Sequence, residues 1–131
     1  MSDTISILGY NVFTGTSTLV SDKVGGDAYF GADDGLHTLM IDLDSFIGSI
    51  KIQASIVKTP TDDDWFNAEI AGTTFAVDTT GKVGTSVAIN LDYTSAETSI
   101  KTYNTVGNFV WIRASISNWT AGIIKRIEIN R

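Results

Sequence analysis

The sequence predicts an all-β protein, folded as one sandwich or barrel domain, and three observations predict it. β-Branched residues dominate, because the 131 residues include 17 threonines, 16 isoleucines and 9 valines, against 6 leucines and one proline. Branching at Cβ restricts the side-chain rotamers and favours the pleated strand over the helix. Apolar and polar residues alternate in many short segments, which glycine, aspartate and threonine separate. We therefore expect a single domain, residues 1–131, of about eight to ten short antiparallel strands.

The expected elements follow this alternation in chain order. The clearest strand is 47–57, where Ile50, Ile52 and Ala54 share one face and polar residues share the other. Glycine and aspartate in residues 21–35 predict a long loop around a short strand at 28–30, and residues 93–99 are expected to form a helical turn. The remaining strands are expected at residues 5–7, 11–20, 36–43, 65–70, 73–77, 85–92, 100–104, 109–117 and 123–130.

A five-residue pattern, Ile-x-Ala-Ser-Ile, occurs twice, at residues 52–56 and 112–116. Two central strands need the same inner row of branched residues, with a small alanine where the opposite layer comes close. We favour this shared packing demand over a duplicated half-domain as the origin of the similarity.

Charge and cysteine content exclude several partners and chemistries. The net charge is −6, so nucleic acid and anionic membranes, which attract basic patches, are not expected partners. There is no cysteine, so we expect no disulfide and no thiolate metal site, and we expect no cofactor. The N-terminus lacks the basic and apolar regions of a signal peptide. We therefore expect a protein made in a cytoplasm and not exported by such a signal.

His37 is the only histidine and the only candidate for an acid–base catalyst. Asp33, Asp34 and Ser45 are close to it in sequence, so a small hydrolase is one alternative. However, the sequence has no Gly-x-Ser-x-Gly elbow, and His37 begins an alternating strand, where we expect an outward-facing polar side chain. The sequence therefore favours a protein that is not an enzyme and has no catalytic residues.

The densest acidic run, Asp62, Asp63 and Asp64, is a weak candidate for a calcium site. Calcium needs about six to eight oxygen ligands, which one loop seldom supplies, and the spacing differs from that of an EF-hand loop. Aspartate is also a common turn residue, because its side chain hydrogen-bonds to nearby backbone. We favour a turn at this position over a metal site.

Aromatic residues supply the candidate binding surface. Phe109, Trp111 and Arg113 share one face of the expected strand 109–117, and aromatic residues with arginine are typical of protein interfaces. We expect these three residues at an interface, with Trp65 and Phe66 as further contacts. Two alternatives stay open, namely packing in the core and a sugar-binding platform built from Trp65, Trp111, Trp119, Tyr10, Tyr29, Tyr93 and Tyr103.

Two segments, SIKIQASIVKTPTDDDWF at residues 49–66 and YNTVGNFVWIRASISNWTAGIIKRIEI at residues 103–129, carry a family resemblance. The Ile-x-Ala-Ser strand, the turn before Trp65-Phe66 and the later Gly-Asn-Phe-x-Trp-Ile-Arg-Ala stretch resemble small β-sandwich structural proteins of tailed bacteriophages, especially those of marine and cyanobacterial hosts. The two segments cover about a third of the chain. The resemblance implies a jelly-roll-like antiparallel sandwich without enzymatic activity.

The resemblance also implies a role in a virion. The expected function is that of a capsid decoration, or cement, protein, which stabilises the shell by bridging neighbouring subunits. Its partners would be the major capsid protein or other virion proteins, in a homo-oligomeric or multi-copy assembly, and residues 1–8 could form an arm that adds a strand to a partner sheet. The alternatives are a neck, tail or fibre component and a carbohydrate-binding, lectin-like module.

Overall fold

The computed structural model describes residues 4–31, 35–77, 83–88 and 90–130, and the side chains of all these except residues 72–88. Ten strands form one hydrogen-bonded sheet in which every pairing is antiparallel, so the predicted all-β fold class is confirmed. No helix in the described part of the chain is long and apolar enough to cross a membrane. The strands are β1 (Thr4–Leu8), β2 (Asn11–Val12), β3 (Leu19–Val20), β4 (Val24–Gly25), β5 (Leu36–Ser55), β6 (Phe66–Asn67), β7 (Ala71–Val77), β8 (Val83–Ala88), β9 (Leu91–Val106) and β10 (Trp111–Asn130), with 3-10 turns η1 (Asp27–Phe30) and η2 (Asp62–Asp64).

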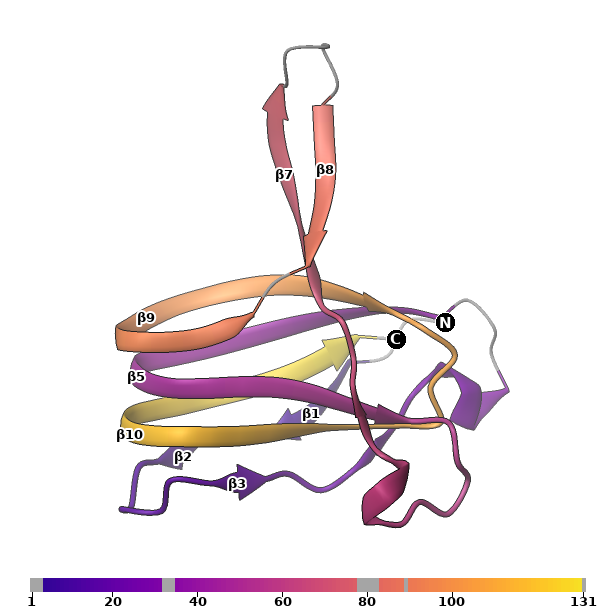
Figure 1. The fold of residues 1–131 in the computed structure, drawn as a ribbon, viewed down its shortest axis with the longest axis horizontal. Helices are drawn as coiled ribbons and strands as arrows, with labels where there is room; N and C mark the ends of the chain where they lie inside the picture. The colour runs from indigo at the N-terminus through magenta and orange to yellow at the C-terminus, as the bar shows by residue number, and fades with distance from the viewer. Residues whose placement is uncertain (1–3, 32–34, 78–82, 89, 131) are drawn as a thin grey trace.

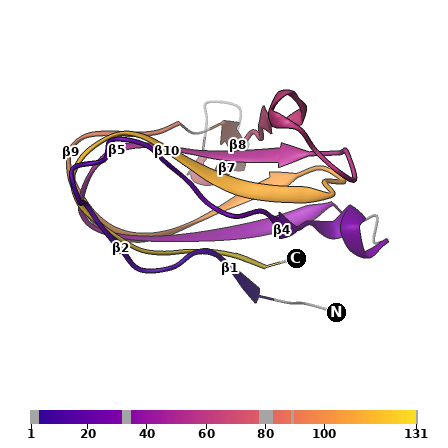
Figure 2. The ribbon, with the colours of Figure 1, turned by 90° about the horizontal axis from the view of Figure 1, so that it is seen from below.

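The sandwich arises because three long strands bend back on themselves. β5 and β10 have 20 residues each and β9 has 16. Seen edge-on, each of them turns at one end of the molecule and contributes to both layers (Figure 2). The two halves of β5 pair with different halves of β10, and the register shifts between Ser117 and Ile123, where the strands turn. We call this side of the molecule the bent end and the opposite side, where the strands start and stop, the open end.

Continuity through the bend corrects several sequence expectations. The two strands expected at residues 36–43 and 47–57 are parts of one strand, which ends at Ser55. The strands expected at 109–117 and 123–130 are likewise parts of one strand, which begins at Trp111. Residues 93–99 lie inside β9 and not in a helical turn, because they continue the strand that pairs with β5. The expected short strand at 28–30 is part of η1, and the expected strand 65–70 is shortened to Phe66–Asn67, which pairs with β5.

The N-terminal segment follows the outer edge of β10 from one end to the other. β1 pairs with residues 127–130 of β10, β2 with 123–124, β3 with 115–116 and β4 with 111–112. The segment that we expected to form an N-terminal arm thus pairs, from Thr4 to Leu8, with β10 of its own chain. This interrupted strand covers one edge of the sandwich.

The two copies of the repeated pentapeptide lie side by side on the paired strands β5 and β10. Ile112 is paired with Ala54, and Ala114 is paired with Ile52. A large and a small side chain are therefore opposite each other twice, which fills the inner surface evenly. The pairing supports the interpretation that the repeat reflects packing.

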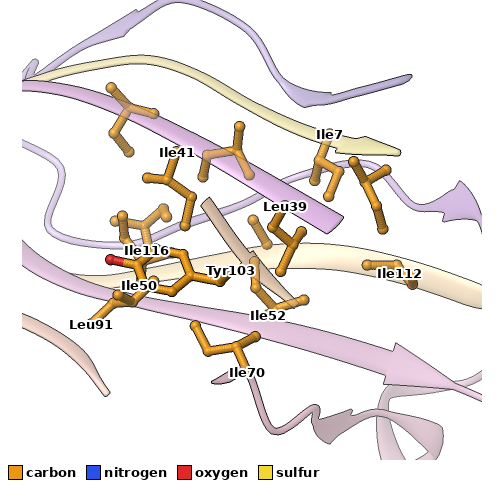
Figure 3. Close-up of a cluster of buried hydrophobic side chains, with 14 of the residues drawn as sticks. Ile7, Leu39, Ile41, Ile50, Ile52, Ile70, Leu91, Tyr103, Ile112 and Ile116 are labelled. Carbon is orange, nitrogen blue, oxygen red and sulfur yellow. The ribbon is translucent and has the colours of Figure 1, made fainter. Parts of the chain in front are cut away.

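The core lies between the two layers and consists mainly of isoleucine and leucine (Figure 3). Its side chains come from both halves of β5 and β10, and β1 and β9 add others. Leu39, Ile112, Ala54, Ile124 and Ile127 have no exposed surface. Among the described residues, every buried side-chain nitrogen and oxygen has a hydrogen-bond partner.

The β7–β8 hairpin projects away from the sandwich (Figure 1). Its pairing with the rest of the described sheet is confined to Ala71, opposite Asn104 of β9. Beyond β7, the sheet ends at β8, whose neighbour in the strand order is β7 alone. The hairpin is thus connected to the sandwich at its base.

Candidate functional site

Exposed apolar side chains gather at the open end of the sandwich. Seven of the eleven exposed large apolar residues among those described lie on elements that begin or end there, or directly follow such an element. They are Tyr29, Phe30, Leu36, Ile56, Val57, Phe66 and Val106. Exposed apolar side chains that gather at one end of a molecule are typical of sites that contact another macromolecule.

An aromatic cluster at this end is built around Trp111. The ring of Tyr29 lies 4.7 Å from the ring of Trp111, and Phe30 meets Tyr29 edge-on at 4.8 Å. The Nζ atom of Lys23 lies 5.0 Å above the Trp111 ring, and Trp111 Nε1 donates a hydrogen bond to the carbonyl oxygen of Lys58 at 2.9 Å. The tryptophan is thus fixed in orientation before any partner arrives.

A glycine makes room for this cluster. Gly25 is paired with Trp111, and a Cβ atom at Gly25 would lie 2.9 Å from the Tyr29 ring and 3.1 Å from the Phe30 ring. A side chain here would displace both rings, which are the exposed part of the cluster. The loop prediction for residues 21–35 missed Phe30, and the sequence analysis named Tyr29 only for the alternative sugar-binding platform. Two adjacent aromatic residues in a segment rich in glycine and aspartate could have signalled both contacts.

A second cluster lies beside the first. The guanidinium of Arg113 stacks 4.1 Å above the ring of Trp65, and Arg113 Nε donates a hydrogen bond to Gln53 Oε1 at 2.8 Å. A shallow hollow of about 260 Å³ connects the two clusters. Its lining residues are Ser21, Asp22, Lys23, Pro60, Asp62, Trp65 and Arg113.

The five residues predicted for the interface are therefore divided by the structure. Trp111, Arg113 and Trp65 lie in the two clusters, and Phe66 is 42% exposed. Phe109 precedes β10 and is buried in the core, where its ring packs on His37 at 5.8 Å and on Phe66 at 5.7 Å. Phe109 thus supports the open end from inside and does not belong to its surface.

His37 is buried beneath the open end and does not point outward, contrary to our expectation. Its Nε2 accepts a hydrogen bond from the backbone N–H of Asp27 at 3.1 Å, and Nδ1 donates to the carbonyl oxygen of Gly35 at 3.1 Å. Asp27 in turn accepts a hydrogen bond from the N–H of Gly35. His37 and Asp27 thus hold η1, and with it Tyr29 and Phe30, against the sandwich, and neither ring nitrogen of His37 faces solvent.

The acidic run forms a capped turn. Asp64 Oδ2 accepts hydrogen bonds from the backbone N–H of Thr61 at 2.7 Å and from its hydroxyl group at 3.1 Å. The Thr61 side chain in turn accepts from the backbone N–H of Asp64, and these reciprocal bonds form a capping box. Among the described residues, no group of three or more acidic or histidine side chains is placed to hold a metal ion.

The tryptophans and tyrosines do not share one surface. Trp119 and Tyr103 are buried in the core, whereas Tyr10 is 65% exposed on the N-terminal segment. One face of Trp65 is covered by Arg113, and Trp111 is flanked by Tyr29 and Lys23. The arrangement suits a protein contact better than a flat platform for a sugar ring.

No protein-family model matches the sequence, and the curated proteins contain no match. A solved structure, that of the SPBc2 prophage-derived protein YomS, is similar to this chain with a TM-score of 0.48 at 10% sequence identity. The similarity covers 99% of this chain and 91% of that one.

Proposed function

We propose that the protein is a non-enzymatic structural component of a bacteriophage virion, and that it docks onto other virion proteins through its open end. The observation that carries the proposal is the pair of neighbouring aromatic and basic clusters around Trp111 and Trp65. Tryptophan, tyrosine and arginine dominate the binding energy of protein interfaces. Hydrogen bonds and stacking fix these side chains in advance, which lowers the entropy lost on binding.

Within this class we propose capsid decoration, with the major capsid protein as the partner. The sequence segments that resemble tailed-phage structural proteins support this role. The net charge of −6 is also consistent with it, because an acidic protein does not adhere to packaged DNA. Many copies on one shell would add avidity to an interface of ordinary size.

The first test is to quantify the chain in phage particles. Phage particles would be purified from a bacterial culture in which this protein is produced. They would be analysed by quantitative mass spectrometry and electron microscopy. A high copy number spread over the shell is expected, while a few copies would overturn decoration in favour of a neck, tail or fibre position. Absence from every particle would refute the virion proposal, and a glycan array would then test the lectin-like alternative.

The second test locates the contact surface with a matched pair of tyrosines. Tyr29 and Tyr10 are both exposed, by 52% and 65%, but only Tyr29 lies in the Trp111 cluster. Particles that lack the chain would be incubated with purified Tyr29→Ala, Tyr10→Ala and wild-type protein, and the bound fraction measured by sedimentation. We expect Tyr29→Ala to weaken binding about tenfold or more and Tyr10→Ala to bind as wild type. Equal binding by all three proteins would exclude the open end as the docking surface.

A further inference from the structure

We propose that the projecting β7–β8 hairpin joins two copies of this chain, through antiparallel pairing of β8 with β8 of a second copy. This inference concerns a surface separate from the open end. An isolated two-stranded hairpin is at best marginally stable in water, yet among the residues that the structure describes this one is paired with the sandwich only at its base (Figure 1). A further strand would supply the pairing that the sandwich does not.

Of the two outer edges of the projecting hairpin, that of β8 is better suited to take up a further strand. In the strand order of the sheet, β7 lies between β9 and β8, so β8 forms the outer edge. The register also differs between the two strands. Three steps along β7, from Thr74 to Val77, match two steps along β8, from Thr85 to Val83, so the extra residue bulges out of β7. β8 is therefore the regular strand, and regular strands accept a new neighbour more readily than bulged ones.

The sequence of the hairpin carries none of the usual protection of a free edge. Edge strands normally avoid association through charged residues or proline. Residues 71–88 contain no proline, and their two charged residues, Asp78 and Lys82, both lie between the strands. β8 itself, Val-Gly-Thr-Ser-Val-Ala, is uncharged and rich in β-branched residues.

The order of residues in β8 points to a second copy as the partner. The five residues from Val83 to Val87 read valine, small residue, threonine, small residue, valine in either direction. Two antiparallel strands related by a two-fold axis through Thr85 place Val83 opposite Val87, Gly84 opposite Ser86, and Thr85 opposite Thr85. β-Branched residues would thus be opposite one another at three positions, which favours strand pairing, and the two-fold axis closes the assembly at a dimer.

The test uses charges at the position where the axis meets the strand. Wild-type protein, Thr85→Lys and Thr85→Glu would each be studied by analytical ultracentrifugation, alone and as a mixture of the two variants. We expect wild type to sediment at about twice the chain mass of 14.1 kDa. Each variant alone places two like charges opposite each other, which destabilises strand pairs, so each is expected to be monomeric. The mixture is expected to restore the dimer, because lysine then lies opposite glutamate.

Two control variants test whether loss of the dimer is specific to a charge on β8. Thr102→Lys places the same charge on an exposed position of β9 in the sandwich and is expected to leave the dimer intact. Tyr29→Ala at the open end is expected to do the same, so failure of either proposal is distinguishable from failure of the other. A wild-type monomer at every concentration up to about 1 mM, the weak limit of protein association, would overturn the inference. So would a mixture of the two variants that stays monomeric, or dimers that Thr85→Lys leaves unchanged.

Discussion

The bent end and the open end of the sandwich are made of the same three long strands but differ in what holds them. At the bent end, β5 and β10 pass from one layer to the other without interruption, through residues with left-handed backbone such as Ser45, Asn118 and Gly122. At the open end the strands stop, and loops and η1 carry exposed aromatic side chains. The backbone strain is concentrated at one end and the candidate binding surface at the other.

The aromatic residues show the same division. At the bent end Phe46 and Trp119 are buried and in contact, with ring centres 5.9 Å apart, and Trp119 Nε1 donates to the carbonyl oxygen of Ala121. At the open end Tyr29 and Phe30 contact each other but remain more than half exposed. The Phe46–Trp119 pair therefore stabilises the fold at the bend, whereas Tyr29 and Phe30 at the open end are available to a partner.

The largest expected effect comes from a methyl group at the bend. Gly122 has a φ of +90°, and a Cβ atom there would lie 2.1 Å from the Ser45 carbonyl oxygen. Gly122→Ala is expected to cost about 4 kcal/mol of unfolding free energy, from left-handed strain and overpacking together. Gly15 has a similar φ of +96°, but a Cβ atom there would have nothing within 4 Å, so Gly15→Ala should cost only about 1 kcal/mol. Chemical denaturation would measure both, and equal costs would show that the close contact at Gly122 is unimportant.

The second prediction compares two phenylalanines. Phe46 has no exposed surface, whereas Phe30 is 58% exposed. Phe46→Ala is expected to lower the free energy of unfolding by about 3–5 kcal/mol, because it removes a buried ring and leaves a cavity. Phe30→Ala is expected to lower the free energy of unfolding by about 1 kcal/mol or less. We expect this variant to weaken binding to particles instead. A thermal melt of each variant tests the contrast, which fails if Phe30→Ala destabilises as strongly as Phe46→Ala.

The third prediction concerns the buried support of the open end. His37→Ala removes the acceptor for the Asp27 N–H and leaves that buried donor without its partner. We expect a cost of about 2 kcal/mol, together with faster amide hydrogen exchange in η1. His37→Asn, whose side chain carries both a donor and an acceptor, is the conservative comparison. Unchanged exchange at residues 27–30 in His37→Ala would contradict the supporting role.

The smallest effect is a pH dependence at the bent end. Burial, followed by a hydrogen bond with Tyr103, raises the pKa of Tyr93 above its ordinary value of 10.0. The folded state therefore keeps this proton more tightly than the unfolded state. Stability is unaffected below about pH 10 and falls as the pH rises above it. Urea denaturation of wild type, Tyr93→Phe and the exposed Tyr10→Phe between about pH 8 and 11 should show a shallower loss for Tyr93→Phe alone.

The fold class and the inner faces of the strands could be predicted from the sequence, because alternation records which residues are buried. Ile50, Ile52 and Ala54 are buried as the pattern indicates, but Ile56, on the same predicted face, is 66% exposed since β5 has ended. The bends could not be predicted. Glycines such as Gly48 and Gly122 also mark strand ends, and only pairing with neighbouring strands distinguishes a bend from an end.

The candidate site could be predicted only in part, because alternation gives information only within a strand. Trp111 and Arg113 were placed on one face by alternation, which holds within β10. Phe109 lies before that strand begins, so the alternation did not apply to it. Tyr29, Phe30 and Lys23 come from a segment without periodicity, and their proximity to Trp111 depends on a strand pairing across about 86 residues of sequence, between Gly25 and Trp111.

The pairing of the N-terminal segment with β10 also determines when the chain can fold. Thr4 is opposite Asn130, so β1 cannot pair until a strand more than a hundred residues later in the sequence has been made. β5 likewise needs β10 to complete both layers. Chains with such long-range pairing fold slowly, in about milliseconds to seconds, because loop closure precedes the gain from contacts. The nascent chain therefore exposes the apolar face of β5 until β10 has been made, and its yield should depend on chaperones.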